Sequence, residues 1–257
     1  MIGSRASGAV LRLLGEFGLA AARLRRHAIE TALSTVFLMM VMLALVSGVE
    51  WAGDMSALPR PEGVAVGLVV WRFAMSAYAS TAVEVAHDIQ FGCLEQLAVG
   101  QGLLSTYLLR SVTHILLGSS AMLLMWYAAS FAISGLPAVS IGALLGIVWL
   151  GAPALVGMGL FVGAANLSFR QSDTINSVLL LCVVVLVSLP GVPFSGTSLL
   201  PFVYAASLAR ALVEDGNPTV FAWLANGLIS AGWLLLGCLA FWSAVRRAKR
   251  LGTLAHR

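Results

Sequence analysis

Residues 140–165 read SIGALLGIVWLGAPALVGMGLFVGAA and contain no charged side chain. A helix needs about 20 mostly apolar residues to cross roughly 30 Å of hydrocarbon, so this stretch is long enough to span a membrane. Five other runs have the same character: Thr31–Val49, Gly63–Val83, Ser111–Ser134, Thr174–Leu189 and Thr219–Val245. The sequence therefore predicts an all-α membrane protein with six transmembrane helices.

The composition excludes an ordinary soluble domain. Hydrophobic residues make up 60% of the 257 residues and charged residues only 10%, with a mean hydropathy of +0.95, whereas soluble domains carry about 25% charged residues. Six spans use most of this length, so we expect one membrane domain at residues 30–245. Cys182 and Cys238 fall in apolar runs and Cys93 in a polar connection, which favours packing thiols over a disulfide framework.

The first 29 residues are predicted to form a cytoplasmic leader with an amphipathic helix on the membrane surface. Apolar residues recur there at helical spacing, and a basic cluster precedes the first span. The apolar residues are Val10, Leu13, Leu14, Phe17, Ala21 and Leu24, and the cluster is Arg23, Arg25, Arg26 and His27. A leader that is merely solvated is the alternative.

Basic residues also predict the topology. Five arginines precede the first span, and Arg246, Arg247, Lys249 and Arg250 open a basic tail at residues 246–257. The connection from Glu50 to Glu62 carries only Arg60 against three acidic residues. Because positive charge concentrates on the cytoplasmic side of spans, both termini are expected in the cytoplasm.

Residues 190–218 interrupt the regular pattern. Pro190, Gly191, Pro193, Gly196 and Pro201 break an apolar stretch. Irregular backbone near a bilayer is tolerated only where protein or water satisfies its polar groups. We therefore predict short re-entrant or interfacial helices on the outer face before the last span, with a plain external loop as the alternative.

The most informative polar segment follows the second span, at about residues 84–104. It reads EVAHDIQFGCLEQL over residues 84–97. Gly92 can end or turn a helix at little cost, and Leu94 and Leu97 then form an apolar stripe beside Glu95. An exposed stripe of this kind needs a partner protein to cover it, unless the segment is an ordinary helix at the membrane interface.

This segment resembles the first cytoplasmic loop of the ABC-2 type permease family, in which acidic residues precede Gly-Thr-Leu-Glu-Gln-Leu. The matching residues are Asp88, Gly92, Leu94, Glu95, Gln96 and Leu97, while Cys93 replaces the usual Thr and Gln90 stands where a second Glu is common. The leader, the six spans, the broken segment and the basic tail are also similar to that family. The resemblance implies that these six residues couple the spans to a nucleotide-binding subunit in a dimeric exporter of the bacterial inner membrane.

The resemblance also implies which subunit binds ATP. No Gly-x-x-x-x-Gly-Lys-Ser/Thr motif occurs, and Lys249 is the single lysine, so this chain has no phosphate-binding P-loop. The chain is expected to be a transport subunit without enzymatic activity, a bound cofactor or a metal site. ATP and Mg²⁺ would bind the partner ATPase.

Three polar residues inside the spans are candidates for a substrate path. Arg72 lies near the middle of the second span, where an unpaired charge is costly. It lines a path, pairs with a polar group, or snorkels to the outer interface. His114 and Asn176 are weaker candidates, since single polar groups often bond neighbouring helices.

Other functions and packing modes remain open at this point. Ser195-Gly196 together with His114 invites comparison with an intramembrane protease, and a stand-alone secondary transporter is the other alternative. Such carriers place acidic residues within their spans, and the carboxylates here are expected in loops, the leader or helix ends. The glycine pairs Gly142/Gly146 and Gly159/Gly163 permit close helix packing, within one subunit or between two. Small amphipathic molecules, lipids and lipid-linked glycans are all possible substrates.

Overall fold

The computed structural model describes residues 61–94, 96–97, 102–132, 141–169, 173–214 and 218–250, with a few positions between 15 and 44. Within these residues all regular secondary structure is helical and no strand occurs. The elements are α3 (Pro61–Gln90), α5 (Leu103–Ala132), α6 (Ile141–Phe169), α7 (Asp173–Ser188), the 3₁₀ helix η1 (Gly196–Leu199), α8 (Val203–Glu214) and α9 (Val220–Arg250).

Four of these helices are long and apolar enough to cross a membrane: α3, α5, α6 and α9. The predicted fifth span corresponds to α7, which has 16 residues and is shorter than the roughly 20 that a bilayer requires. The predicted first span, Thr31–Val49, lies mostly outside the described residues. The all-helical architecture is confirmed for the described residues, with four helices that could span a membrane, and the count of six spans stays a prediction.

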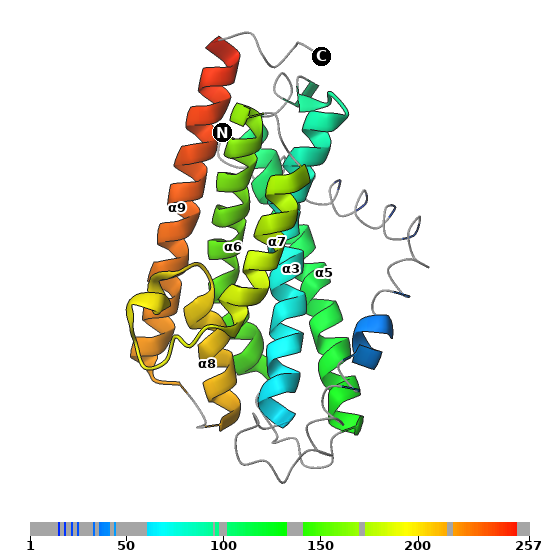
Figure 1. Cartoon of the computed structure of the whole chain (residues 1–257), viewed down its shortest axis with the longest axis vertical. Helices are drawn as coiled ribbons and strands as arrows, with labels where there is room; N and C mark the ends of the chain where they lie inside the picture. Colours follow the sequence, from blue (N-terminus) through cyan, green and yellow to red (C-terminus); the bar gives the residue numbers. More distant parts are fainter. Residues whose placement is uncertain are drawn as a thin grey trace, which may run out of the picture.

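Helix α6 lies at the centre of the bundle. It runs beside α9 and α3, and α3 in turn packs against α5, α7 and α8 (Figure 1). The main core is built from small and medium side chains on these helices, including Ala74, Ala77, Leu155 and Ala209, none more than 1% exposed. The most apolar helix, α6, therefore lies inside the bundle, whereas one side of α5 and one side of α9 are exposed.

Glycines set the closest helix contacts. A Cβ atom on Gly157 would collide with the Trp233 carbonyl, and one on Gly237 would collide with the backbone of Gly157, so α6 and α9 touch at this crossing. Gly159 and Gly163 let α6 pack closely on α3, because a Cβ atom would collide with the Thr81 hydroxyl at Gly159 and crowd the Val85 side chain at Gly163. The prediction of close glycine packing within one subunit is therefore confirmed for this pair.

The helix boundaries differ from the predicted spans around the first polar connection. Helix α3 continues from the predicted end at Val83 to Gln90, and α5 begins at Leu103 instead of Ser111. The connection between α3 and α5 is therefore residues 91–102, of which Leu94, Gln96 and Leu97 are helical. The physical reason is that the polar side chains in both extensions find partners on the facing helix, so the helices need not end where hydrophobicity falls.

At the far end of the molecule, the predicted broken segment contains two short helices, η1 and α8. Phe202, just before α8, has a φ of 66°, a region that costs energy for a residue with a Cβ atom. Its ring is 2% exposed and stacks on Phe73 of α3 at a centroid distance of 6.4 Å. Tertiary packing therefore holds this backbone in place.

The ends of the chain differ in how far the structure describes them. Helix α9 continues past the predicted end at Val245 to Arg250, so the first five residues of the predicted basic tail are helical. Nearly all of the predicted leader at 1–29, and residues 251–257, lie outside the described part of the chain.

Candidate functional site

A buried charge cluster joins α3 to α5 near the turn that follows α3. Arg110 Nη1 of α5 donates to Asp88 Oδ2 at 2.8 Å and to Glu84 Oε2 at 3.2 Å. The three side chains are 12%, 7% and 15% exposed, respectively. Glu84 and Asp88 are four residues apart and so lie on one face of α3, where one guanidinium reaches both.

Two more side chains of α5 complete the cluster. The Tyr107 hydroxyl donates to Asp88 Oδ2 at 2.8 Å, and His114 Nε2 lies 3.8 Å from Glu84 Oε1. Tyr107, Arg110 and His114 are spaced by three and four residues, so they share the face of α5 that meets α3.

Because the cluster is buried, its charges cost free energy unless they remain paired. Removing one partner of a buried ion pair typically costs about 3–5 kcal/mol, because a charge is left without compensation. Ionisable groups within membrane helices are by default candidates for function. Arg110 can bind either of two carboxylates, so the contact between α3 and α5 can adjust. The buried carboxylates can also hold a charge or bind a proton.

The turn after α3 is connected to the cluster through Asp88. The Asp88 carbonyl accepts the Cys93 N–H at 3.0 Å, while the Asp88 side chain binds Arg110 and Tyr107. Gly92 has a φ of 68°, the left-handed conformation in which glycine commonly ends a helix. Asp88 therefore connects the backbone of the turn to the buried cluster.

The predicted apolar stripe of this turn is wrong in one respect. Leu94 is 6% exposed and packs with Val85, Leu103 and Tyr107, so it covers its own helices and is not presented to a partner. Leu97 is partly buried against the same residues. The physical reason is that the positive φ of Gly92 folds the chain back over the α3–α5 contact.

What the turn presents outward is a different set of side chains. His87 and Gln96 are exposed, and Phe91 is 66% exposed with its ring 4.3 Å from that of His87. We call His87, Phe91 and Gln96 the turn surface. Glu95, the acidic residue of the predicted coupling site, lies outside the described residues.

The residues predicted for a substrate path do not gather at one place. His114 belongs to the charge cluster through Glu84. Arg72 lies half-buried in α3 and makes no hydrogen bond or ion pair with another residue in the described part of the chain. Asn176 lies in α7, and its side chain is outside the described part.

A cavity of about 560 Å³ lies elsewhere, between α3, α7 and α8. Its described lining is mainly apolar, with Trp71 and Arg210 as the largest polar side chains, and it includes neither Arg72 nor His114. The Trp71 indole N–H is buried without a hydrogen-bond partner among the described residues. This cavity is a better candidate for binding an apolar molecule than the three predicted residues.

Arg210 of α8 was not singled out by the sequence. Its guanidinium donates to the carbonyls of Val187 at 2.9 Å, Ser188 at 3.3 Å and Leu189 at 2.8 Å, which are the last carbonyls of α7. Helix ends leave such carbonyls without partners, and arginine side chains can satisfy them. Arg210 thus ties the end of α7 to α8.

The geometry gives no support to a serine protease site. The Ser195 hydroxyl lies 2.8 Å from Thr197 Oγ1 within its own turn, and His114 lies in α5 beside Glu84. A general base must come within hydrogen-bond reach of its nucleophile. Among the described residues, these two do not form such a pair.

Sequence reasoning assigned Asp88 and His114 to different sites and missed Glu84, Tyr107 and Arg110 as members of this one. The signal was present as spacing: two acidic residues four apart at the end of one helix, and Tyr, Arg and His at three- and four-residue intervals at the start of the next.

Comparisons with protein-family models, curated proteins and solved structures find no match.

Proposed function

We propose that this chain is the permease subunit of an ATP-driven exporter of the ABC-2 type. In this proposal six spans form half of a dimeric pathway in the bacterial inner membrane, with both termini in the cytoplasm. A separate subunit binds ATP and Mg²⁺ and hydrolyses the nucleotide. The exported molecule is a small amphipathic compound, a lipid or a lipid-linked glycan.

The observation that carries the proposal is the connection between the turn surface and the buried cluster through Asp88. The turn surface exposes an aromatic ring to a partner, and aromatic side chains are common anchors in protein interfaces. A displacement of the turn would be transmitted to Asp88, and from there to α5 through Arg110 and Tyr107. This is the arrangement that a coupling element requires.

The position of the turn supports the same proposal. Figure 1 places the turn after α3 and the last turn of α9 at the same end of the bundle. That end of α9 carries Arg247, Lys249 and Arg250, and basic residues mark the cytoplasmic ends of spans. An ATPase in the cytoplasm would therefore meet the turn surface.

The mechanism follows from differential affinity. If one conformation of the bundle opens inward and another outward, ATP on the partner shifts the balance between them only if the partner binds the two conformations differently. The turn surface is where that difference would arise. The cluster would pass the movement of the turn from Asp88 to α5.

Affinity purification of the tagged protein from gently solubilised native membranes tests this proposal. A P-loop ATPase should co-purify with the wild type and be depleted by Glu95→Arg. Glu62→Arg is the matched control, because Glu62 lies in the first turn of α3, at the opposite end of that helix. Recovery with all three proteins would remove Glu95 from the site, and recovery with none after mild crosslinking would reject the exporter.

A second candidate is an ion-coupled secondary transporter, and one observation favours it. The carboxylates of Glu84 and Asp88 are buried near the end of a helix that is long enough to span the membrane. Buried acidic groups beside a histidine are typical of proton relays. Efflux of ethidium from cells that produce the protein distinguishes the two: a protonophore stops a secondary transporter while ATP remains high.

A further inference from the structure

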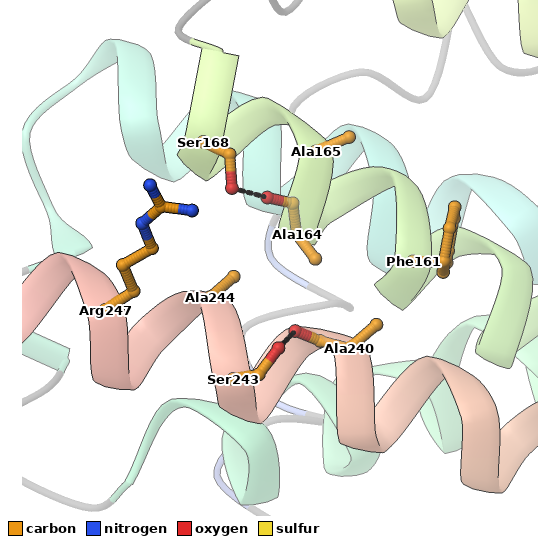
Figure 2. A pocket seen from close by; sticks show the side chains of 8 residues that line it. All are labelled: Phe161, Ala164, Ala165, Ser168, Ala240, Ser243, Ala244 and Arg247. Atoms are coloured by element: carbon orange, nitrogen blue, oxygen red, sulfur yellow. Dashed lines mark hydrogen bonds between the residues drawn. The ribbon is translucent and has the colours of Figure 1, made fainter.

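A second hollow of the molecule lies between α6 and α9. It is a groove of about 520 Å³, open to the outside of the bundle (Figure 2). Its lining is Phe161, Ala164, Ala165 and Ser168 of α6 with Ala240, Ser243, Ala244 and Arg247 of α9. Both helices are long and apolar enough to span the membrane, so the groove faces lipid.

The groove arises because the two helices touch at one place and carry small side chains beyond it. They meet at Gly157 and Gly237. From there towards the basic end of α9, the alanines of both helices leave the space between them unfilled. The section of α6 from Phe161 to Ser168 rises about 10 Å, roughly a third of the hydrocarbon thickness.

The two hydroxyl groups in the walls of the groove are both bonded to their own helix. Ser168 donates its hydroxyl to the Ala164 carbonyl at 3.0 Å, and Ser243 donates to the Ala240 carbonyl at 2.7 Å (Figure 2). Hydroxyls bonded to their own helix leave the surface effectively apolar. The groove is therefore suited to a hydrocarbon chain.

One end of the groove is charged. Arg247 rises from α9 on the side of Ser168, and Phe161 lies at the other end (Figure 2). Arg247 is exposed and makes no hydrogen bond or ion pair with any residue in the described part of the chain. The neighbouring Arg246 differs, because its guanidinium stacks on the Trp242 ring at 3.9 Å.

We propose that this groove binds an anionic phospholipid from the leaflet at the basic end of α9, with an acyl chain between α6 and α9 and the phosphate on Arg247. Guanidinium groups bind phosphate oxygens through two parallel hydrogen bonds, and basic pockets between membrane helices attract anionic headgroups. The contact at Gly157 and Gly237 closes the groove towards the membrane centre. A chain end fits such a groove, whereas a partner's spanning helix would have to continue past the contact.

Native mass spectrometry of the full-length protein in detergent tests this inference. The protein is titrated with dioleoylphosphatidylglycerol and, separately, with the zwitterionic dioleoylphosphatidylcholine. We expect preferential binding of the anionic lipid, weakened about five- to tenfold by Arg247→Gln, as for the loss of one basic residue at a membrane surface. Arg246→Gln is the matched control: it removes the same charge one residue away and should retain binding.

A second variant separates the acyl-chain site from simple charge attraction. Ala244→Phe fills the groove and leaves Arg247 in place, so it should also reduce binding of the anionic lipid. Circular dichroism and a monodisperse elution profile verify that each variant is folded. Excess sn-glycerol 1-phosphate should not displace the lipid, because the free headgroup lacks the acyl chain.

Three results would overturn the inference. Equal losses in Arg247→Gln and Arg246→Gln would mean a general surface attraction. Unchanged binding in folded Ala244→Phe, or displacement by glycerol phosphate, would mean that no acyl chain occupies the groove. Each of these outcomes is independent of whether an ATPase partner exists.

Discussion

Two arginines hold the two ends of this bundle by different chemistry. At the basic end, Arg110 binds the side-chain carboxylates of Glu84 and Asp88. In the proline-broken segment, Arg210 binds the main-chain carbonyls of Val187, Ser188 and Leu189. Both guanidinium groups join two helices, but one does so through mobile charged groups and the other through fixed backbone.

The difference indicates which end can change. Carboxylates on side chains can rotate, exchange partners and take up protons, whereas carbonyls at a helix end are fixed in direction by the helix itself. We therefore interpret the α3–α5 cluster as the adjustable joint and the α7–α8 contact as the rigid one. The joint lies beside the turn surface, where the proposed partner would bind.

The largest expected effect is that of Arg110→Met. It leaves two buried carboxylates without their cation and should lower the free energy of unfolding by about 3–5 kcal/mol. Unfolding of the purified protein in mixed detergent and SDS, followed by circular dichroism, measures this. The triple variant Glu84→Gln, Asp88→Asn, Arg110→Met removes all three charges and should recover much of the loss; if it is as unstable as Arg110→Met, charge is not the cause.

Arg210→Met should have a smaller effect. Three carbonyls at the end of α7 lose their charged donor, and the expected cost is about 1–3 kcal/mol in the same assay. Arg210→Lys keeps the charge but not the fork of donors, so it should fall between the wild type and the methionine variant. A lysine variant with wild-type stability would show that charge alone matters at this end.

Tyr107→Phe tests the hydrogen bond between Tyr107 and Asp88 within the cluster without altering any charge. Loss of the hydroxyl bond to Asp88 should cost about 1 kcal/mol. In a double-mutant cycle with Asp88→Asn, the two effects should not be additive, because the groups are in contact. Additive effects would contradict the 2.8 Å bond.

His114→Gln should have the smallest effect on stability. His114 Nε2 is 3.8 Å from Glu84, and its side chain is 31% exposed, so the change should be about 0.5 kcal/mol or less. If ethidium efflux driven by a proton gradient nevertheless disappears in this variant, the secondary-transporter proposal gains over the exporter.

Much of the fold could be predicted from apolar runs. The run at 140–165 corresponds to α6, and the pair Gly159/Gly163 faces α3 as close packing requires. Hydropathy alone placed the beginning of α5 too late, at Ser111 instead of Leu103. Glu84 and Arg110 each continue a helix, because each satisfies the other's charge across the interface.

The site was harder to predict because its partners are distant in sequence. Arg110 lies 26 residues from Glu84, and spacing within one helix shows which face a residue occupies but not which helix it meets. The inward position of Leu94 follows from the backbone angle of Gly92, which a stripe of leucines does not indicate. Arg210 satisfies backbone carbonyls, and such partners leave no trace in the side-chain pattern.

The most direct test of the exporter account uses a photocrosslinking amino acid, p-benzoylphenylalanine, at two exposed phenylalanines. Phe91 is 66% exposed on the turn surface, and Phe194 is 56% exposed in the proline-broken segment. After irradiation of cells, adducts are identified by mass spectrometry. The account predicts a P-loop ATPase crosslinked at position 91 and not at 194. An ATPase adduct at neither position, or at 194 alone, would contradict it.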